Sequence, residues 1–327
     1  MTSIPTQGIA LLDSSFPLPL DRPFTTAQAA REGVPRHVLT TLVRDGLLRR
    51  LLKGVYVAAQ VPDSLLLRCR ALALVAPPGA VVTDRTAGWL HSGNTLAPND
   101  HLEVPPVSMF RRAGSSRLRT KLTRSGERTF LPEDTTVIHG LEVTTELRTA
   151  WDLGRLLHRD QAIGGLDAML RLGRFSKDRL VGGVERFRGQ RGVVQLRELA
   201  PLADGRAESP GESTLRLRWL DAADLPRPQP QLPVFVAATG STYFLDLGVE
   251  ELRYAAEYDG ERWHSSDEDV ERDRVRRTLL RETCGFTIDV LRRENVYGPR
   301  QDASRILYEG IRRARRRLGL RRPTYLT

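Results

Sequence analysis

The segment 243–264 constrains the fold of this chain more than any other stretch. It holds two apolar runs, 243–247 and 252–258, separated by a short acidic turn. Apolar runs of this length joined by a turn predict a β-hairpin. Asp246 lies near the end of the first run, and Glu257 and Asp259 lie at the end of the second. Residues two apart on a strand share a face, so the hairpin should bring all three carboxylates together.

Three carboxylates at the end of a hairpin predict a site for a hard divalent cation, Mg²⁺ or Mn²⁺, which takes oxygen ligands. His264 follows five residues after Asp259 and could act on a water molecule or a leaving group. The alternative is a trio of solvated surface acids, which is the commoner arrangement. Against it, Glu257 is flanked by Tyr-Ala-Ala and Tyr, an apolar setting in which an unpaired carboxylate is costly.

A longer pattern carries a resemblance to a known family. The chain reads D-x10-E-x-D-G-x3-H, then D-x2-R-x2-L-L, then C-G-F-x4-L-R. This order resembles the Vsr-like branch of the PD-(D/E)xK nuclease superfamily over residues 209–308. The resemblance implies a restriction-endonuclease-like αβββαβα core. It also implies metal ligands at Asp246, Glu257 and Glu212, and further catalytic residues at Asp259 and His264.

The chain departs from that superfamily at one position. Asp259 stands where the usual motif has a lysine, and no lysine follows Lys177. If the module cuts DNA, His264 or an arginine such as Arg262 or Arg276 must supply the charge or the proton transfer. The departure leaves open a second interpretation, in which the nuclease fold is catalytically degenerate and serves only for binding.

Residues 24–58 predict a winged helix-turn-helix. Thr25 or Thr26 should cap a helix over 27–32, Gly33 supplies the turn, and a second helix should cover 35–45. A two-strand wing follows around Lys53. Polar and basic residues on the second helix and the wing suit contacts with DNA bases and phosphates. The residues expected to contact DNA are Arg36, His37, Thr40, Thr41, Arg44, Arg49, Arg50 and Lys53. The alternative is a winged helix that contacts only protein.

The first two-thirds of the chain resemble AbiEi-type antitoxins of type IV toxin–antitoxin systems. In the winged helix the resemblance rests on Phe24, Ala27, Gly33-Val34 and Leu39, followed by L-x5-G-V-Y. Further along it rests on T-x3-R-T-x2-D-L, which is Thr144, Arg148, Thr149, Asp152 and Leu153. It implies that the winged helix binds the promoter of its operon and represses it, and that a cognate toxin protein is a possible partner.

The composition supports an anionic partner. The chain of 327 residues has a net charge of +10, with 47 arginines and only 3 lysines, and such a balance favours nucleic acid. The two cysteines lie far apart and give neither metal-ligand spacing nor a disulfide framework. No apolar stretch is long enough to span a membrane, and no signal peptide is visible. The expected location is therefore the cytoplasm, without membrane association.

The fold class expected is α+β with several domains. The divisions are a winged helix over 1–60, a mixed α/β middle domain over 61–202, and the nuclease-like module over 203–327. Residues 203–211 have the composition of a linker. Residues 305–322 contain eight arginines against one acid. They form either a solvated helix face or a surface that holds phosphates.

Three functions fit these observations. The first is a metal-dependent DNA endonuclease with an N-terminal DNA-reading module, acting in defence or repair. The alternative is a DNA-binding repressor or antitoxin with a degenerate nuclease fold. A third is a structural partner of a neighbouring toxin. The sequence leaves the oligomeric state and the DNA site open.

Overall fold

The computed structural model describes residues 11–92, 107–115, 123–222, 224–260, 267–297 and 300–320. By its internal contacts the chain divides into two compact units. The first combines Met1–Gly93 with Asn99–Thr149, and the second combines Asn94–Pro98 with Ala150–Thr327. The finer division into three domains at residues 60 and 202 stays a prediction.

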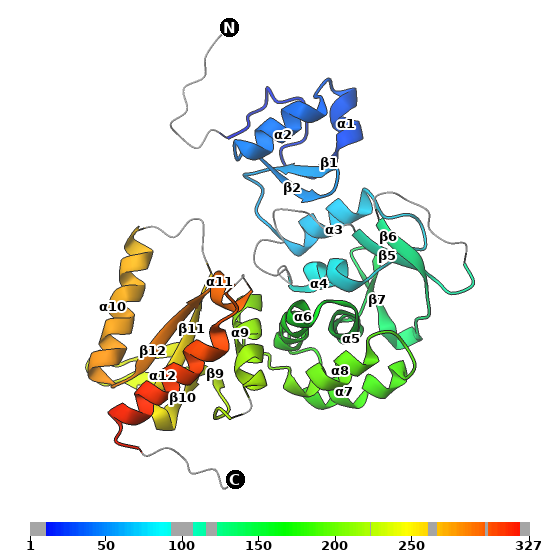
Figure 1. Ribbon diagram of the computed structural model, residues 1–327. Helices are drawn as coiled ribbons and strands as arrows, with labels where there is room; N and C mark the ends of the chain where they lie inside the picture. The colour runs from blue at the N-terminus through cyan, green and yellow to red at the C-terminus, as the bar shows by residue number, and fades with distance from the viewer. Residues whose placement is uncertain are drawn as a thin grey trace. The chain divides into compact units, whose positions relative to one another are not determined.

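The first unit begins with the expected winged helix (Figure 1). Its elements are β1 (Phe24–Thr25), α1 (Thr26–Arg31), α2 (Arg36–Arg44), β2 (Leu48–Leu52) and β3 (Val55–Ala58), and the sheet order is β1-β3-β2. Thr25 caps α1 and forms a capping box with Gln28. Phe24, Leu39 and Tyr56 are buried in its core.

A five-stranded sheet forms the rest of the first unit. Its elements are α3 (Leu65–Ala73), β4 (Val81–Val82), α4 (Asp84–Ser92), β5 (Val107–Arg112), β6 (Thr123–Arg128), η1 (Pro132–Asp134), β7 (Thr135–Ile138) and β8 (Leu141–Thr144). The strand order is β6-β5-β4-β8-β7. Leu52 and Val55 of the wing share a core with this sheet, so the winged helix is packed onto it. Residues 101–104, which the sequence predicts to be a short strand, lie outside the described residues.

Helices lead from this sheet into the C-terminal module. They are α5 (Glu146–Leu156), α6 (Arg159–Arg171), α7 (Lys177–Gly182) and α8 (Val193–Leu199), with short 3-10 turns η2 (Val184–Phe187) and η3 (Ala200–Leu202). The sequence of the middle domain predicts helices near 146–157, 160–172, 177–187 and 194–199, and the observed positions agree. None of the helices in the described ranges is both long and apolar enough to cross a membrane.

The C-terminal module has the expected order of elements. These are α9 (Pro210–Asp221), β9 (Gln229–Val236), β10 (Ser241–Val249), η4 (Glu250–Leu252), β11 (Tyr254–Asp259), α10 (Asp267–Thr283), β12 (Thr287–Arg292), α11 (Arg293–Val296) and α12 (Ala303–Arg317). The sheet order is β12-β11-β10-β9, with β12 parallel to β11 and the other neighbours antiparallel. The assignment of this module to nucleases stays a proposal.

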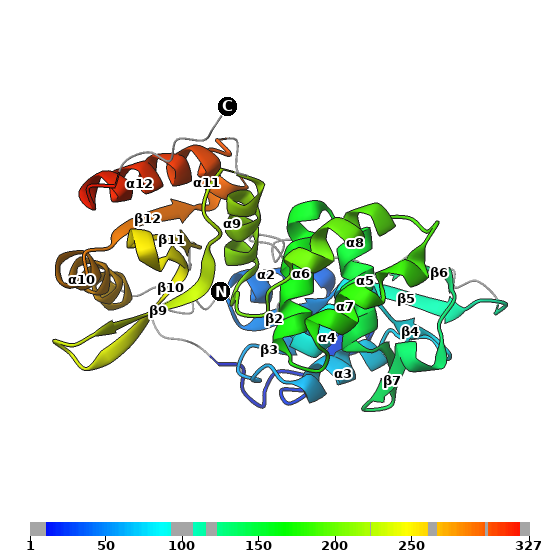
Figure 2. The same ribbon diagram turned by 90° about the horizontal axis from the view of Figure 1, so that it is seen from below.

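Helices cover both faces of this sheet (Figure 2). On one face, Trp219 of α9 and Leu307 of α12 are buried against Tyr254 of β11. On the other face, Leu280 of α10 is buried with Ile288 of β12. The sheet is therefore the middle layer of three, and its hydrophobic residues are divided between two cores.

The sequence predicts a strand at 235–238, but strand β9 begins six residues earlier, at Gln229. Pro230 and Pro233 hid it, because proline cannot donate a ladder hydrogen bond and usually argues against a strand. β9 is an edge strand, where proline is tolerated.

The turn between β10 and β11 also differs from the expected one at 248–251. Strand β10 continues to Val249, and the chain reverses through η4 and Arg253, whose φ of 47° is left-handed.

The segment expected to be a linker is fixed in place. Ala203 and Ala207 are buried, and the Asp204 N–H donates to Asp167 Oδ1 of α6 at 2.8 Å. Three ion pairs then join α6 to α9: Arg216–Asp167 at 2.6 Å, Arg218–Asp160, and Arg159–Asp221 at 2.7 Å. The composition of 203–211 suggested flexibility, but burial and pairing with α6 decide its conformation.

Candidate nucleic-acid interface and acidic site

Helix α2 presents one polar face to solvent. Leu39 is fully buried while Val38, Leu42 and Val43 are partly buried, and this 3.6-residue spacing fixes which side faces the core. The remaining positions are all exposed, and they are the five helix residues expected to contact DNA: Arg36, His37, Thr40, Thr41 and Arg44. This face carries cationic and hydroxyl groups, which suit phosphates and base edges.

The wing places its basic residues less uniformly. Arg50 and Lys53 are exposed, whereas Arg49 is half-buried and donates to the Val61 carbonyl oxygen. The hydrogen bond from Arg68 lowers the pKa of Asp63, and the nearby charge of Arg49 lowers it further. Arg49 therefore holds the end of the wing in place. The role of all eight residues in binding DNA stays a prediction.

In the C-terminal module, Glu212, Asp246 and Glu257 come from three different elements. Glu212 lies in the first turn of α9 and is 8% exposed. Its Oε2 accepts hydrogen bonds from the Glu208 N–H at 2.9 Å and from Gln231 Nε2 at 3.0 Å. These bonds orient the carboxylate inside the module.

Asp246 on β10 carries the clearest electrostatic signal of the module. Burial raises its pKa to about 7, and the charges of Glu212 and Glu257 push it in the same direction. The Tyr258 N–H donates to Asp246 Oδ2 at 2.8 Å and opposes that rise. The structure thus brings Glu212 and Glu257 close enough to Asp246 for their charges to disfavour its ionisation.

Glu257 on β11 is 3% exposed and is held by two arginines of α10. Arg276 Nη2 donates to Oε1 at 2.8 Å, and Arg277 Nε donates to Oε2 at 2.6 Å. Both oxygens of this carboxylate therefore face guanidinium groups. Arg276 belonged to the D-x2-R pattern, but sequence reasoning missed Arg277, which lies beside it without any motif of its own.

Asp259 pairs with a different arginine from the two that hold Glu257. Its side chain is 39% exposed and its Oδ2 is 3.6 Å from Arg292 Nε of β12. His264 and Arg262 lie outside the described residues. Among the residues that the structure describes, no three His, Cys, Asp or Glu side chains are placed to hold a metal ion together.

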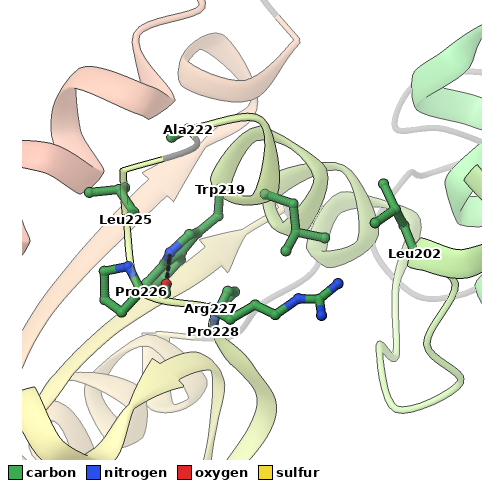
Figure 3. A pocket seen from close by; sticks show the side chains of 8 residues that line it. Leu202, Trp219, Ala222, Leu225, Pro226, Arg227 and Pro228 are labelled. Carbon is green, nitrogen blue, oxygen red and sulfur yellow. Dashed lines mark hydrogen bonds between the residues drawn. The ribbon is translucent and has the colours of Figure 1, made fainter. Parts of the chain in front are cut away.

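The module also contains a pocket of about 240 Å³ at the end of α9 (Figure 3). Trp219 forms one wall, and its Nε1–H donates to the Pro226 carbonyl oxygen at 2.9 Å. The residues that line it are Leu202, Trp219, Leu220, Ala222, Leu225, Pro226, Arg227 and Pro228. None of the residues predicted for catalysis lines it.

The fold and these surfaces agree with two matches to family models. Residues 21–59 match the family described as "Transcriptional regulator, AbiEi antitoxin", and residues 80–202 match the family described as "AbiEi antitoxin C-terminal domain". The first match covers the winged helix, and the second runs from β4 to the end of η3. The class is thus a protein that carries AbiEi antitoxin domains.

Two curated proteins of Mycobacterium tuberculosis are similar over most of the chain. They are "Uncharacterized protein MT2308" and "Uncharacterized protein Rv2248", each 36% identical over 270 residues, covering 79% of this chain and 92% of the relative. The chain belongs to one family with these two proteins. Because 79% of the chain is more than its first 202 residues, the similarity extends into the C-terminal module.

A solved structure is also similar, though weakly. It is the "Crystal structure of RV2827C protein from Mycobacterium tuberculosis", with 12% identity, a TM-score of 0.28, and coverage of 68% of this chain and 86% of the other. A similarity at this level supports no argument about function.

Proposed function

We propose that this protein is a DNA-binding transcriptional regulator of the AbiEi antitoxin type. The observation that carries the proposal is the match of residues 21–59 to an antitoxin regulator family, on a winged helix whose α2 face is exposed. Arg36 and Arg44 lie at the two ends of that face. In this proposal they hold DNA phosphates while His37, Thr40 and Thr41 approach base edges.

The test is binding to the DNA upstream of the protein's own gene. Fluorescence anisotropy would compare this DNA with a scrambled duplex of equal length at several salt concentrations. The double variant Arg36→Ala/Arg44→Ala should weaken binding to both and reduce the salt slope by about 0.9 for each phosphate that it no longer neutralises. Arg31→Ala is the matched control, because Arg31 is exposed on α1 of the same winged helix. Equal affinity for both DNAs by the parent protein would contradict sequence-specific regulation.

The antitoxin domains further support a cognate toxin as the partner. This part of the proposal rests on the match of residues 80–202 to the AbiEi antitoxin C-terminal domain. The protein would be co-expressed with the product of the adjacent gene, and the two should co-purify through gel filtration. A neighbouring gene whose product neither binds this protein nor slows growth on its own would argue against the toxin.

A second candidate function is cleavage of phosphodiester bonds by the C-terminal module. The observation that favours it is that Glu212 and Glu257 lie near enough to Asp246 to contribute to its raised pKa of about 7. Carboxylates of this kind are ligands for Mg²⁺ or Mn²⁺ in other proteins. The order of elements, α9 to α12, is also the one implied by the resemblance to PD-(D/E)xK nucleases.

The arrangement of side chains does not fit a metal ion as it stands. Both oxygens of Glu257 accept hydrogen bonds from Arg276 and Arg277, so these arginines would have to release Glu257 before it could bind a cation. We therefore derive no catalytic step through a metal. Plasmid nicking, measured in Mg²⁺, in Mn²⁺ and in EDTA, tests the candidate. Nicking that persists in Asp246→Ala would show that Asp246 has no catalytic role.

A further inference from the structure

The C-terminal half of α12 concentrates positive charge on one side. The helix contains six arginines and one glutamate, and its buried side consists of Ala303, Leu307, Gly310, Ile311 and Ala314. At 100° per residue, Arg312, Arg313, Arg316 and Arg317 fall within an arc of about 140° on the opposite side. All four are exposed.

Acids neutralise only part of this charge. Arg305 pairs with Asp302 and Glu309, and Arg313 pairs with Asp289 at 2.5 Å. No acid follows Glu309 in α12, so the last two turns of the helix carry no negative side chain of their own. The helix dipole favours cations in a last turn, which accounts for part of the arginine content.

Two further arginines from other elements meet α12 at the turn between α10 and β12. Arg253 Nη1 donates to the Cys284 carbonyl oxygen at 3.3 Å, and Arg317 Nη2 donates to the Arg281 carbonyl oxygen at 3.3 Å. Arg281 itself donates to the Ile288 carbonyl oxygen at 2.9 Å. Each of these three guanidinium groups is thus held by neutral carbonyl oxygens, and no ion pair with an acid is seen for them among the residues that the structure describes.

Gly285 shows how near two of these charges are to each other. A Cβ built on Gly285 would lie 3.1 Å from Arg253 Nη1 and 3.9 Å from Arg317 Nη2, so these nitrogens are at most 7.0 Å apart. Like charges at that distance repel each other. A helix dipole accounts for part of the placement of Arg281, which is in the last turn of α10, but not for Arg253, which lies between η4 and β11.

We propose that this arginine face, made of Arg253, Arg281, Arg312, Arg316 and Arg317, binds the phosphate backbone of nucleic acid without reading its sequence. Arginine binds phosphate oxygens through paired N–H donors, and a run of phosphates would relieve the repulsion among these residues. The face would give the protein a second DNA-binding surface, on a different unit from the winged helix. The inference does not depend on sequence-specific reading by α2.

The test uses the full chain and a scrambled 30-base-pair duplex, with dissociation constants measured by anisotropy across a range of salt. The variant Arg312→Gln/Arg316→Gln removes two exposed charges. It should weaken binding on the order of tenfold and reduce the salt slope by roughly 1.8. Arg305→Gln is the matched control, because Arg305 is on the same helix but is already paired with acids. It should change binding little.

Thermal unfolding checks that each variant is folded. If the folded Arg312→Gln/Arg316→Gln variant keeps the affinity and the salt slope of the parent, the proposal is wrong. If the same variant binds DNA normally but loses an acidic protein partner, the face is a protein interface and the proposal is also wrong. If the parent protein does not prefer its upstream DNA, only the proposal that it is a sequence-specific regulator is wrong. The measurement on scrambled duplex would still decide the role of the arginine face.

Discussion

The buried carboxyl of Asp246 gives a prediction whose magnitude can be worked from the structure. Its pKa rises from 3.8 to about 7 on folding. The native protein therefore binds this proton more tightly than the unfolded chain does. Well below pH 3.8 the carboxyl is neutral in both states and costs nothing. Above about pH 7 it is ionised in both, and the native state bears a penalty of at most about 4 kcal/mol.

Asp246→Asn removes this penalty while keeping an oxygen that can accept the Tyr258 N–H. The rise in pKa already includes the opposing effect of the Tyr258 hydrogen bond, so the gain from the substitution is at most the penalty itself. We therefore expect the variant to match the parent near pH 4 and to exceed it by about 2–4 kcal/mol at pH 8. The parent should lose stability, relative to the variant, as the pH rises between these values.

Urea unfolding at pH 4, 5.5, 7 and 8, followed by tryptophan fluorescence, measures this difference. Trp219 reports on the core of the C-terminal module, because the centroids of its ring and of the Tyr254 ring are 5.5 Å apart. Asp259→Asn is the matched control, since Asp259 is a partly exposed acid on the neighbouring strand. A stability difference between Asp246→Asn and the parent that stays constant from pH 4 to pH 8 would refute the reasoning. If Mg²⁺ removes the advantage of Asp246→Asn at pH 8, the acids bind the metal after all.

Three further predictions concern packing within the two units. Arg216→Ala leaves the buried Asp167 without its cation and should lower the free energy of unfolding by about 3–5 kcal/mol at pH 8. The loss should be smaller in acid, where Asp167 is protonated, and urea unfolding at both pH values measures the difference. Thr25→Ala removes the cap of α1 and should cost about 1 kcal/mol, seen as a lower unfolding midpoint. Gly310→Ala should cost about 1–3 kcal/mol in calorimetry, because its Cβ would lie 2.5 Å from Tyr254 Oη.

The sequence alone predicted the local architecture well. The winged helix followed from the cap at Thr25, the turn at Gly33 and the short wing around Gly54, and each of these signals is carried by neighbouring residues. The α-βββ-α-β-α order of the C-terminal module was implied by the resemblance to nucleases, and the structure has this order of elements. The sequence predicted only the end of edge strand β9, from residue 235, because the prolines before it argue against a strand.

The sequence also indicated which acids matter, but not what surrounds them. Asp246 and Glu257 stand out by type and spacing, and the resemblance to nucleases adds Glu212. Nothing in the spacing shows that α10 directs Arg276 and Arg277 onto Glu257, which lies 19 and 20 positions earlier in the chain. The pKa of Asp246 likewise depends on burial and on charges from two other elements.

Periodicity, caps and turn residues act within a few positions, so the order of helices and strands was determined by the sequence by itself. Ion pairing and desolvation depend on which surfaces meet after the chain has folded. Only the tertiary structure could therefore decide that Arg276 and Arg277 donate hydrogen bonds to the carboxylate of Glu257. It also decided that residues 203–209 are fixed against α6, and that Arg253, Arg281 and Arg317 meet at one turn.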